Sequence, residues 1–290
     1  MRKIVTPFAL LAVARAVLAA EPDAAAIARI TGLQPEVKNG VAKVSVPRTD
    51  LTVTVDGVRM SPFQGFTSWA AFTGAGGGAV VMGDLTLAED EVSPVMDAAL
   101  GAGLEVTALH NHFSFDRPRI LFMHIGGAGT TEQLATAVRK ALDAIKEARH
   151  GPPAEGFGPP RVAAENGIDP KPLEAIFGAG GQAKDGMVKF VFGTKTTAHG
   201  ADLGAEMGVN TWAAFAGTPQ AAVVDGDFAM LETELQPVLK ALRAARINVV
   251  AIHSHMIHEQ PRIMFLHFWG KGPAEELARG IEAARRTQRS

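Results

Sequence analysis

One block of the chain occurs twice, and every matched pair of positions, such as Trp69 and Trp212, is separated by 143 residues. Residues 69–129 align with residues 212–272 without a gap, and 27 of the 61 aligned positions are identical. Weaker similarity upstream extends each copy to about 120 residues, an ordinary domain size and longer than the ~20–50 residues of a solenoid repeat. The sequence therefore predicts two similar domains related by a pseudo-twofold axis, which either share one continuous sheet or pack face to face.

Composition divides the chain into four segments. Residues 1–20 combine a basic start, an apolar run and small residues before Glu21, which is the pattern of a signal peptide. Residues 151–160 contain four prolines and three glycines, which cannot continue a helix and bury little surface. We expect a signal peptide at 1–20, a first repeat unit at 21–150, a Pro/Gly-rich linker at 151–168 and a second repeat unit at 169–290.

Hydrophobic spacing within the unit alternates between the strand period and the helix period. In the first copy, strand spacing is found at 41–46, 51–55, 79–82, 104–112 and 119–125, and helical spacing at 89–102 and 131–148. The predicted class is α+β, with two tandem homologous β-β-α-β-β-α units, largely antiparallel sheets, and the helices on one side.

Six histidines occupy equivalent places in the two copies and predict a metal site in each. Alternate residues of a strand share a face, so the first two histidines of a copy point the same way. If His110 pairs with Phe122 on a returning strand, His124 lies diagonally beside His110, about 7 Å away. A register shifted by one residue would place His124 on the other face. Because imidazole is a common ligand of transition metals, the predicted ligands of an ion such as Zn²⁺ are His110, His112, His124, His253, His255 and His267.

Charge and cysteine content restrict what else the chain can do. The net charge is −2 and the basic residues are scattered, so we expect no nucleic-acid partner. The chain has no cysteine, which excludes disulfides and a thiol nucleophile. No segment after the N-terminal one approaches the ~20 apolar residues of a membrane-spanning helix, so we expect no stable membrane insertion.

Charged residues near the histidines complete the predicted site. Glu89 and Glu234 are candidate catalytic bases, although acidic residues in a first helical turn also simply complement the helix dipole. Arg119 and Arg262 are candidate ligand-binding residues for an anion, or else they fix a turn by pairing with a nearby carboxylate.

Three further features have more than one interpretation. Asp84 and Asp227 follow a strand and could be helix caps, metal ligands or turn residues. The glycine-rich segments 126–129 and 270–272 run from a strand toward a helix, a geometry suited to an anion. His258 has no counterpart in the first copy, which favours the second copy as the working site.

Several motifs together resemble the LppY and LpqO family of exported bacterial proteins, a domain of unknown function. They are Trp69-Ala70-Ala71-Phe72, Val81 to Leu85, Glu89 to Val92, Ala108 to His112 and Pro118 to Gly126, with their second copy from Trp212 to Gly270. The resemblance implies a location in the cell envelope but no established reaction. Because no cysteine is present for acylation, we expect a periplasmic or secreted protein without a lipid anchor.

The leading functional hypothesis is an exported protein with a histidine-based metal site, either a metal-dependent hydrolase or a metal carrier. The alternative is a non-enzymatic periplasmic binding protein for an anionic small molecule or an envelope polymer. A third interpretation is a structural duplication whose histidines only form hydrogen bonds.

Overall fold

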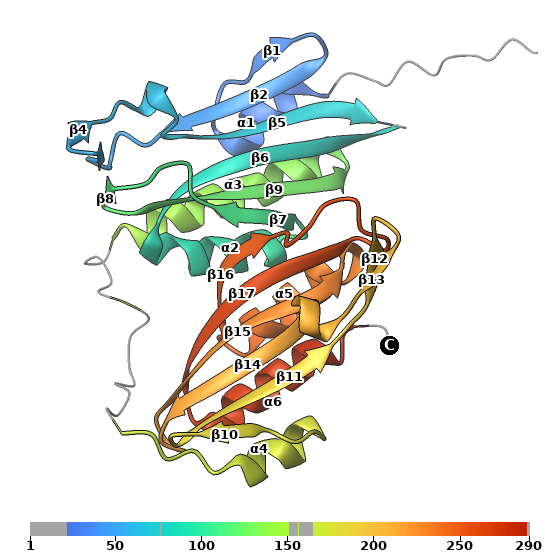
Figure 1. Ribbon diagram of the computed structural model, residues 1–290. Helices are drawn as coiled ribbons and strands as arrows, with labels where there is room; N and C mark the ends of the chain where they lie inside the picture. Colours follow the sequence, from blue (N-terminus) through green and yellow to red (C-terminus); the bar gives the residue numbers. More distant parts are fainter. Residues whose placement is uncertain (1–21, 76, 151–155, 157–164, 289–290) are drawn as a thin grey trace, which may run out of the picture.

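A single sheet of twelve strands runs through the molecule (Figure 1). The computed structural model describes residues 22–75, 77–150, 156 and 165–288. The strand order is β1-β2-β5-β6-β9-β7-β16-β17-β15-β14-β11-β10. The first six strands belong to the first repeat unit. The last six are the equivalent strands of the second unit, in the reverse order. Of the two expected arrangements, the continuous sheet is therefore the one that forms. The predicted signal peptide and most of the predicted linker lie outside the described residues.

The two units contain equivalent elements. In the first unit they are α1 (Ala24–Thr31), β1 (Glu36–Lys38), β2 (Val41–Pro47), β5 (Thr67–Ala75), β6 (Gly78–Ala88), α2 (Val92–Gly101), β7 (Glu105–His110), β9 (Ile120–Gly129) and α3 (Thr131–Ala148). In the second unit they are α4 (Pro170–Phe177), β10 (Gln182–Lys184), β11 (Met187–Gly193), β14 (Asn210–Gly217), β15 (Ala222–Leu231), α5 (Leu235–Ala244), β16 (Asn248–His253), β17 (Ile263–Gly272) and α6 (Ala274–Arg285). Short 3₁₀ turns, η2 (Glu89–Glu91) and η4 (Glu232–Glu234), precede α2 and α5.

Each unit is larger than the six-element order expected from the sequence, although the mixed class and the antiparallel pairing agree with it. The strand expected over 51–55 is reduced to β3 (Thr54–Val55), and a nine-residue strand, β5, pairs with β2 and β6 instead. The small residues Ala70, Ala71 and Gly74 weaken the hydrophobic alternation of β5, so its pattern alone is a poor strand signal.

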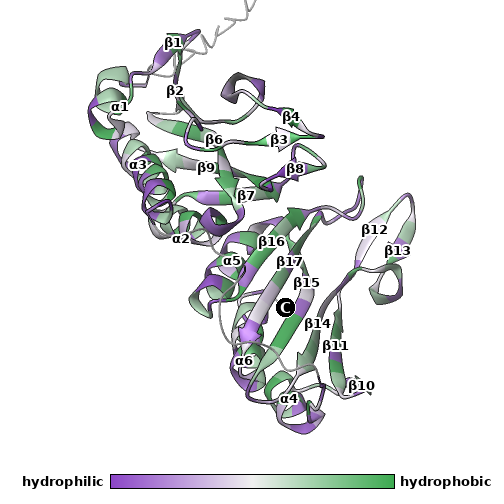
Figure 2. Ribbon diagram, turned by 90° about the vertical axis from the view of Figure 1, so that its left-hand side faces the viewer, coloured by the Kyte–Doolittle hydropathy of each residue, from purple (hydrophilic) through white to green (hydrophobic). Residues whose placement is uncertain are grey.

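The two units meet where β7 pairs with β16. Leu109 lies opposite Ile252 in this antiparallel pair, and these two residues are themselves equivalent in the repeat. The pseudo-twofold axis therefore passes between them. The helices α1 to α6 lie on one face of the sheet (Figure 2), and α2 contacts α5 across the seam. Among the described residues, the opposite face carries no α-helix.

Helix packing explains the glycine-rich segments that the sequence associated with anion binding. Residues 126–129 and 270–272 are the last residues of β9 and β17, just before α3 and α6. A Cβ at Gly270 would stand 2.8 Å from Leu277 Cδ2 of α6, well inside the normal contact distance. Gly270 therefore lets α6 approach the sheet closely, and anion binding at these segments stays a prediction. Within the described residues, no helix is long and apolar enough to cross a membrane.

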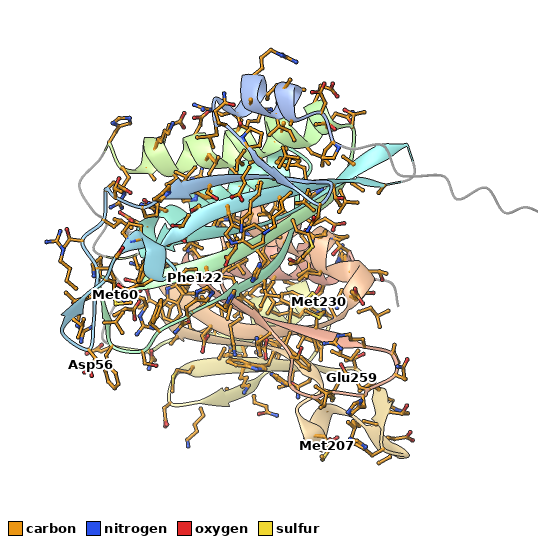
Figure 3. All side chains as sticks on the ribbon, turned by 90° about the horizontal axis from the view of Figure 1, so that it is seen from above. Asp56, Met60, Phe122, Met207, Met230 and Glu259 are labelled. Carbon is orange, nitrogen blue, oxygen red and sulfur yellow. The ribbon has the colours of Figure 1, made fainter. Side chains whose placement is uncertain are left out.

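A flap covers part of the open face in each unit. The first is the small sheet β4 (Val58–Arg59), β3 and β8 (Asp116–Arg117), and the second is the hairpin of β12 (Thr196–Ala198) and β13 (Ala201–Leu203). Figure 3 shows Asp56 and Met60 of the first flap on one side of the molecule and Met207 of the second on the other. Under the flaps lie two apolar clusters, which contain Phe122 and Phe265.

Candidate metal centre

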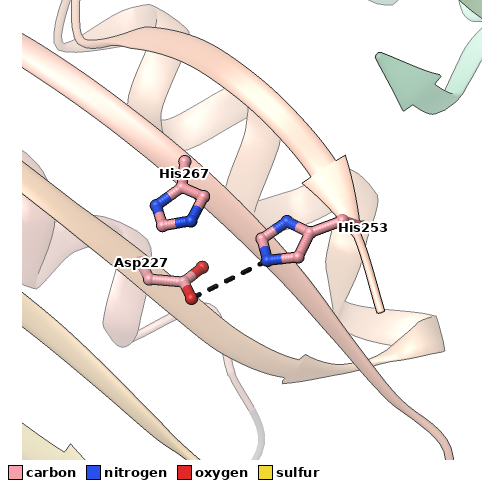
Figure 4. Close-up of side chains that lie close together, drawn as sticks. All are labelled: Asp227, His253 and His267. Carbon is pink, nitrogen blue, oxygen red and sulfur yellow. Dashed lines mark ion pairs between the residues drawn. The ribbon is translucent and has the colours of Figure 1, made fainter. Parts of the chain in front are cut away.

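The second unit gathers three histidines and one aspartate on the open face. His253 is the last residue of β16 and His255 follows in the loop, while Asp227 and His267 lie directly opposite one another on β15 and β17. Ala251 is the residue of β16 that pairs with His267, so His253 lies diagonally beside it. Figure 4 shows the side chains of Asp227, His253 and His267 turned toward one another.

The spacing of the donor atoms suits a small metal ion. Asp227, His253 and His267 each offer one ligand atom, and these three atoms all lie within 4.8 Å of one another. His255 Nε2 is 3.1 Å from His253 Nε2 and 3.3 Å from Asp227 Oδ2, and the His253 Nε2 to Asp227 Oδ2 distance is 4.0 Å. Ligands of a tetrahedral zinc ion, with bonds near 2.0–2.1 Å, stand about 3.3 Å apart. Small side-chain rotations would bring these donors to that spacing.

Neighbouring groups fix the orientation of the rings. His267 Nδ1 is 3.2 Å from the Gly226 carbonyl oxygen. Since that oxygen can only accept a hydrogen bond, we assign the proton of the neutral ring to Nδ1, which leaves the Nε2 lone pair free. The rings of His253 and His267 stack at 4.9 Å, and the ring of His255 stacks at 3.5 Å on buried Phe265. This outer layer is the kind that orients histidine ligands in metalloproteins.

The cluster surrounds a buried carboxyl group whose nearest ionisable neighbours are the histidines. Asp227 is 2% exposed, and burial raises the pKa of its carboxyl group, against the opposing effect of His267 and His255. Burial, with smaller contributions from His267 and His255, lowers the pKa of His253 to about 4, so its imidazole is neutral at pH 7. Within the described part of the chain, no lysine or arginine pairs with Asp227. A desolvated carboxylate is costly unless a positive charge compensates it.

The first unit repeats this arrangement with a looser geometry. The ring of His110 lies 5.0 Å from that of His124 and 5.1 Å from that of His112, and His124 Nδ1 is 3.2 Å from the Gly83 carbonyl oxygen. His110 pairs with Phe122, in the register that the sequence predicted. Burial is the largest cause that lowers the pKa of both His110 and His112.

The two aspartates differ between the copies. The distance from His112 Nε2 to Asp84 Oδ2 is 3.8 Å, longer than its counterpart in the second unit. Asp84 Oδ1 is buried without a hydrogen-bond partner, whereas Asp227 Oδ1 accepts a bond of 3.1 Å from the Leu266 N–H. The second cluster is therefore the tighter and better ordered of the two.

The two predicted catalytic glutamates lie in different surroundings. Glu234 is buried, accepts a hydrogen bond of 2.9 Å from the Leu231 N–H, and lines a cavity whose walls include none of the six histidines. It serves as a helix cap, which corrects its assignment as a base. Glu89 is exposed and lies on a cavity between the units, whose wall includes His267.

The predicted arginines and His258 also have different neighbours from those expected. Arg119 and Arg262 are exposed, and the nearby carboxylates of Asp116 and Glu259 accept bonds from backbone N–H groups instead of pairing with them. Arg119 lies on the cavity between the units, but Arg262 is not part of that wall. His258 packs against His199, 5.7 Å away, and not against the cluster. The extra histidine is therefore no reason to favour the second copy.

The sequence alone does not decide whether Asp84 and Asp227 are caps, metal ligands or turn residues. In both copies the aspartate carboxyl group faces the histidines. The available signal was the Gly-Asp pair retained in both copies, Gly83-Asp84 and Gly226-Asp227. In each copy, the glycine carbonyl holds one histidine and the aspartate faces the same histidine from the next strand.

Fold and site together define a duplicated protein with one antiparallel sheet, helices on one face, and a histidine–aspartate cluster in each copy on the other face. The chain belongs to the family described as Domain of Unknown Function (DUF1259), which matches residues 25–144 and 171–287. The match confirms a duplicated domain of unknown function, and the LppY and LpqO name stays a resemblance. No curated protein matches the chain.

Two solved structures are distantly similar. The trimeric bacterial microcompartment shell protein PduB is 15% identical, with a TM-score of 0.21, over 87% of this chain and 89% of its own. EtuB from Clostridium kluyveri is 12% identical, with a TM-score of 0.20, over 89% of this chain and 90% of its own. TM-scores this low carry no structural or functional conclusion for this chain.

Proposed function

We propose that Asp227, His253 and His267 bind a divalent transition metal ion, with His255 at the rim of the site. The observation that carries this proposal is the buried Asp227 carboxylate, which faces imidazole rings and has no lysine or arginine partner among the described residues. A divalent cation would supply the missing charge. Nitrogen and oxygen donors at this spacing favour zinc over calcium or magnesium, which prefer oxygen ligands.

The reaction we propose is hydrolysis, in an exported protein located in the periplasm or secreted. A zinc ion bound by three protein ligands can lower the pKa of a bound water to about 7. His255 is suited to accept the proton, because its side chain is 34% exposed and its Nε2 faces Asp227 and His253. Glu234 is not suited to this role because it is occupied as a cap, whereas Glu89 lies on the cavity whose wall includes His267.

Metal content of matched variants tests the proposal. Protein purified without chelators and offered Zn²⁺, Mn²⁺, Fe²⁺ and Cu²⁺ should retain one of these ions, measured by elemental analysis after desalting. Asp227→Asn should lose most of the bound ion, while Asp84→Asn, the same change in the looser copy, should keep the ion of the second site. If neither the wild type nor any variant binds metal above background, the proposal is wrong.

A non-enzymatic binding protein is the second candidate, and the position of Arg119 on the cavity between the units supports it. A ligand held there without turnover would make the chain a carrier or receptor. Recovery of an unchanged ligand after prolonged incubation with metal-loaded protein would favour this function over hydrolysis.

A further inference from the structure

A cavity of about 680 Å³ lies at the seam between the two units, within the usual size of about 300–1,000 Å³ for ligand pockets. Its walls come from both units and are mostly apolar. The first unit contributes Ser93 and Arg119, and the second contributes Val249, His267 and Trp269. The cavity therefore reaches one histidine of the candidate metal centre.

The repeat explains why this cavity exists on one side of the axis. On the other side, the side-chain amide of Gln236 crosses the seam. Its Oε1 accepts a hydrogen bond of 3.1 Å from the Val106 N–H, and its Nε2 donates one of 2.9 Å to the Val106 carbonyl oxygen. The residue equivalent to Gln236 is Ser93, whose shorter side chain instead donates a hydrogen bond of 2.9 Å to Asn248 Oδ1. The equivalent of Val106 is Val249, which stands on the cavity wall.

Two further differences shape the open side. Trp269 replaces Gly126, and Asp225 replaces Met82, at equivalent positions of the repeat. Trp269 and Asp225 face each other across β15 and β17 and both line the cavity. The side of the axis that contains the cavity therefore has an aromatic wall, which the side closed by Gln236 lacks.

We propose that the seam cavity binds a small molecule carrying a carboxamide or peptide amide. The amide N–H and C=O pair with the backbone of Val249, as the Gln236 amide pairs with that of Val106, and the apolar part of the ligand lies against Trp269. Binding itself needs no metal ion. Cleavage of such a ligand at the neighbouring His267 would rest on the proposed hydrolytic function.

Binding of 3-phenylpropanamide to the full protein, followed by calorimetry, tests the inference. The comparison compound is methyl 3-phenylpropanoate, which has the same apolar part and contains no amide N–H group. We expect the ester to bind about tenfold more weakly, the size of effect produced when a buried acceptor loses its donor. The titrations are run with chelator and with added Zn²⁺. Amide binding in both conditions supports the cavity assignment even if no metal is retained.

Exchange of the two equivalent residues gives the matched variants. Ser93→Gln should close the cavity as Gln236 closes the other side, and should abolish amide binding while leaving bound metal unchanged. Gln236→Ser should keep the original site. Trp269→Gly serves as a second test of the cavity if Ser93→Gln does not fold, as judged by its thermal transition. The inference is overturned if wild-type protein does not bind the amide, if amide and ester bind equally, or if the folded cavity variants bind the amide as wild type does.

Discussion

Substitution of Gly226 by alanine should destabilise the second unit and disturb its histidine cluster together. An alanine Cβ at this position would stand 2.1 Å from Phe268 Cζ and 2.4 Å from the Trp212 carbonyl oxygen, where normal contacts are about 3.5–4.0 Å. Neither group can move easily. Phe268 is fully buried against Phe228, and β14 pairing at Ala213 fixes the Trp212 carbonyl.

Overpacking of this kind costs about 1–3 kcal/mol, and with a backbone oxygen as one clashing group we expect about 3 kcal/mol. The midpoint of thermal unfolding should fall by roughly 6–12 °C, at about 2–4 °C per kcal/mol for a large domain. The Gly226 carbonyl also orients His267. The variant should therefore bind Zn²⁺ more weakly at temperatures where it remains folded.

Gly101→Ala is the matched control, because an added Cβ at this position in α2 meets no atom within 4 Å. Alanine is favoured over glycine in a helix by about 0.5–1 kcal/mol, so this variant should be slightly stabilised. Unfolding by urea and by heat, at fixed metal concentration, measures both variants. A Gly226→Ala protein whose unfolding midpoint lies within 1 °C of the wild-type value would refute the reasoning. It would show that the strand can shift enough to accommodate the added Cβ.

Two further predictions concern pH and export. The pKa of His253 is lowered to about 4, so between the ordinary His value of about 6.5 and pH 4 the folded state binds fewer protons than the unfolded state. The free energy of unfolding of the metal-free protein should therefore decrease as the pH is lowered through this range. In the His253→Asn variant, urea unfolding at successive pH values should show a smaller decrease. Export should remove the N-terminus near Ala20, and an intact Met1 on protein isolated from the native host would contradict that prediction.

The register of the histidine strands could be predicted from the sequence because side chains alternate along β9 and along β7 from Ala108 onward, beyond the bulge between Val106 and Ala108. A shift of one residue would have moved the buried Met123 and Ile125 to the open face, so hydrophobic burial selects the register that pairs His110 with Phe122. The gapless duplication likewise determined that both units share one strand order, since equivalent apolar patterns bury equivalent faces.

Other features depended on contacts between residues far apart in the chain. Asp227 joins the cluster because β15 pairs with β17, which brings it opposite a histidine 40 residues later in the sequence. Glu234 is removed from the site because its carboxylate is needed by an unpaired backbone N–H at the start of a helix.

The choice between one sheet and two packed sheets was likewise decided by tertiary structure. It rests on the pairing of β7 with β16 at Leu109 and Ile252, whose local patterns suit either arrangement. The seam cavity depends on the difference in side-chain length between Ser93 and Gln236 and on the replacement of Gly126 by Trp269. These differences matter only because the fold brings the residues to the seam. Local sequence determined which side of each strand is buried, whereas long-range packing determined which polar groups meet.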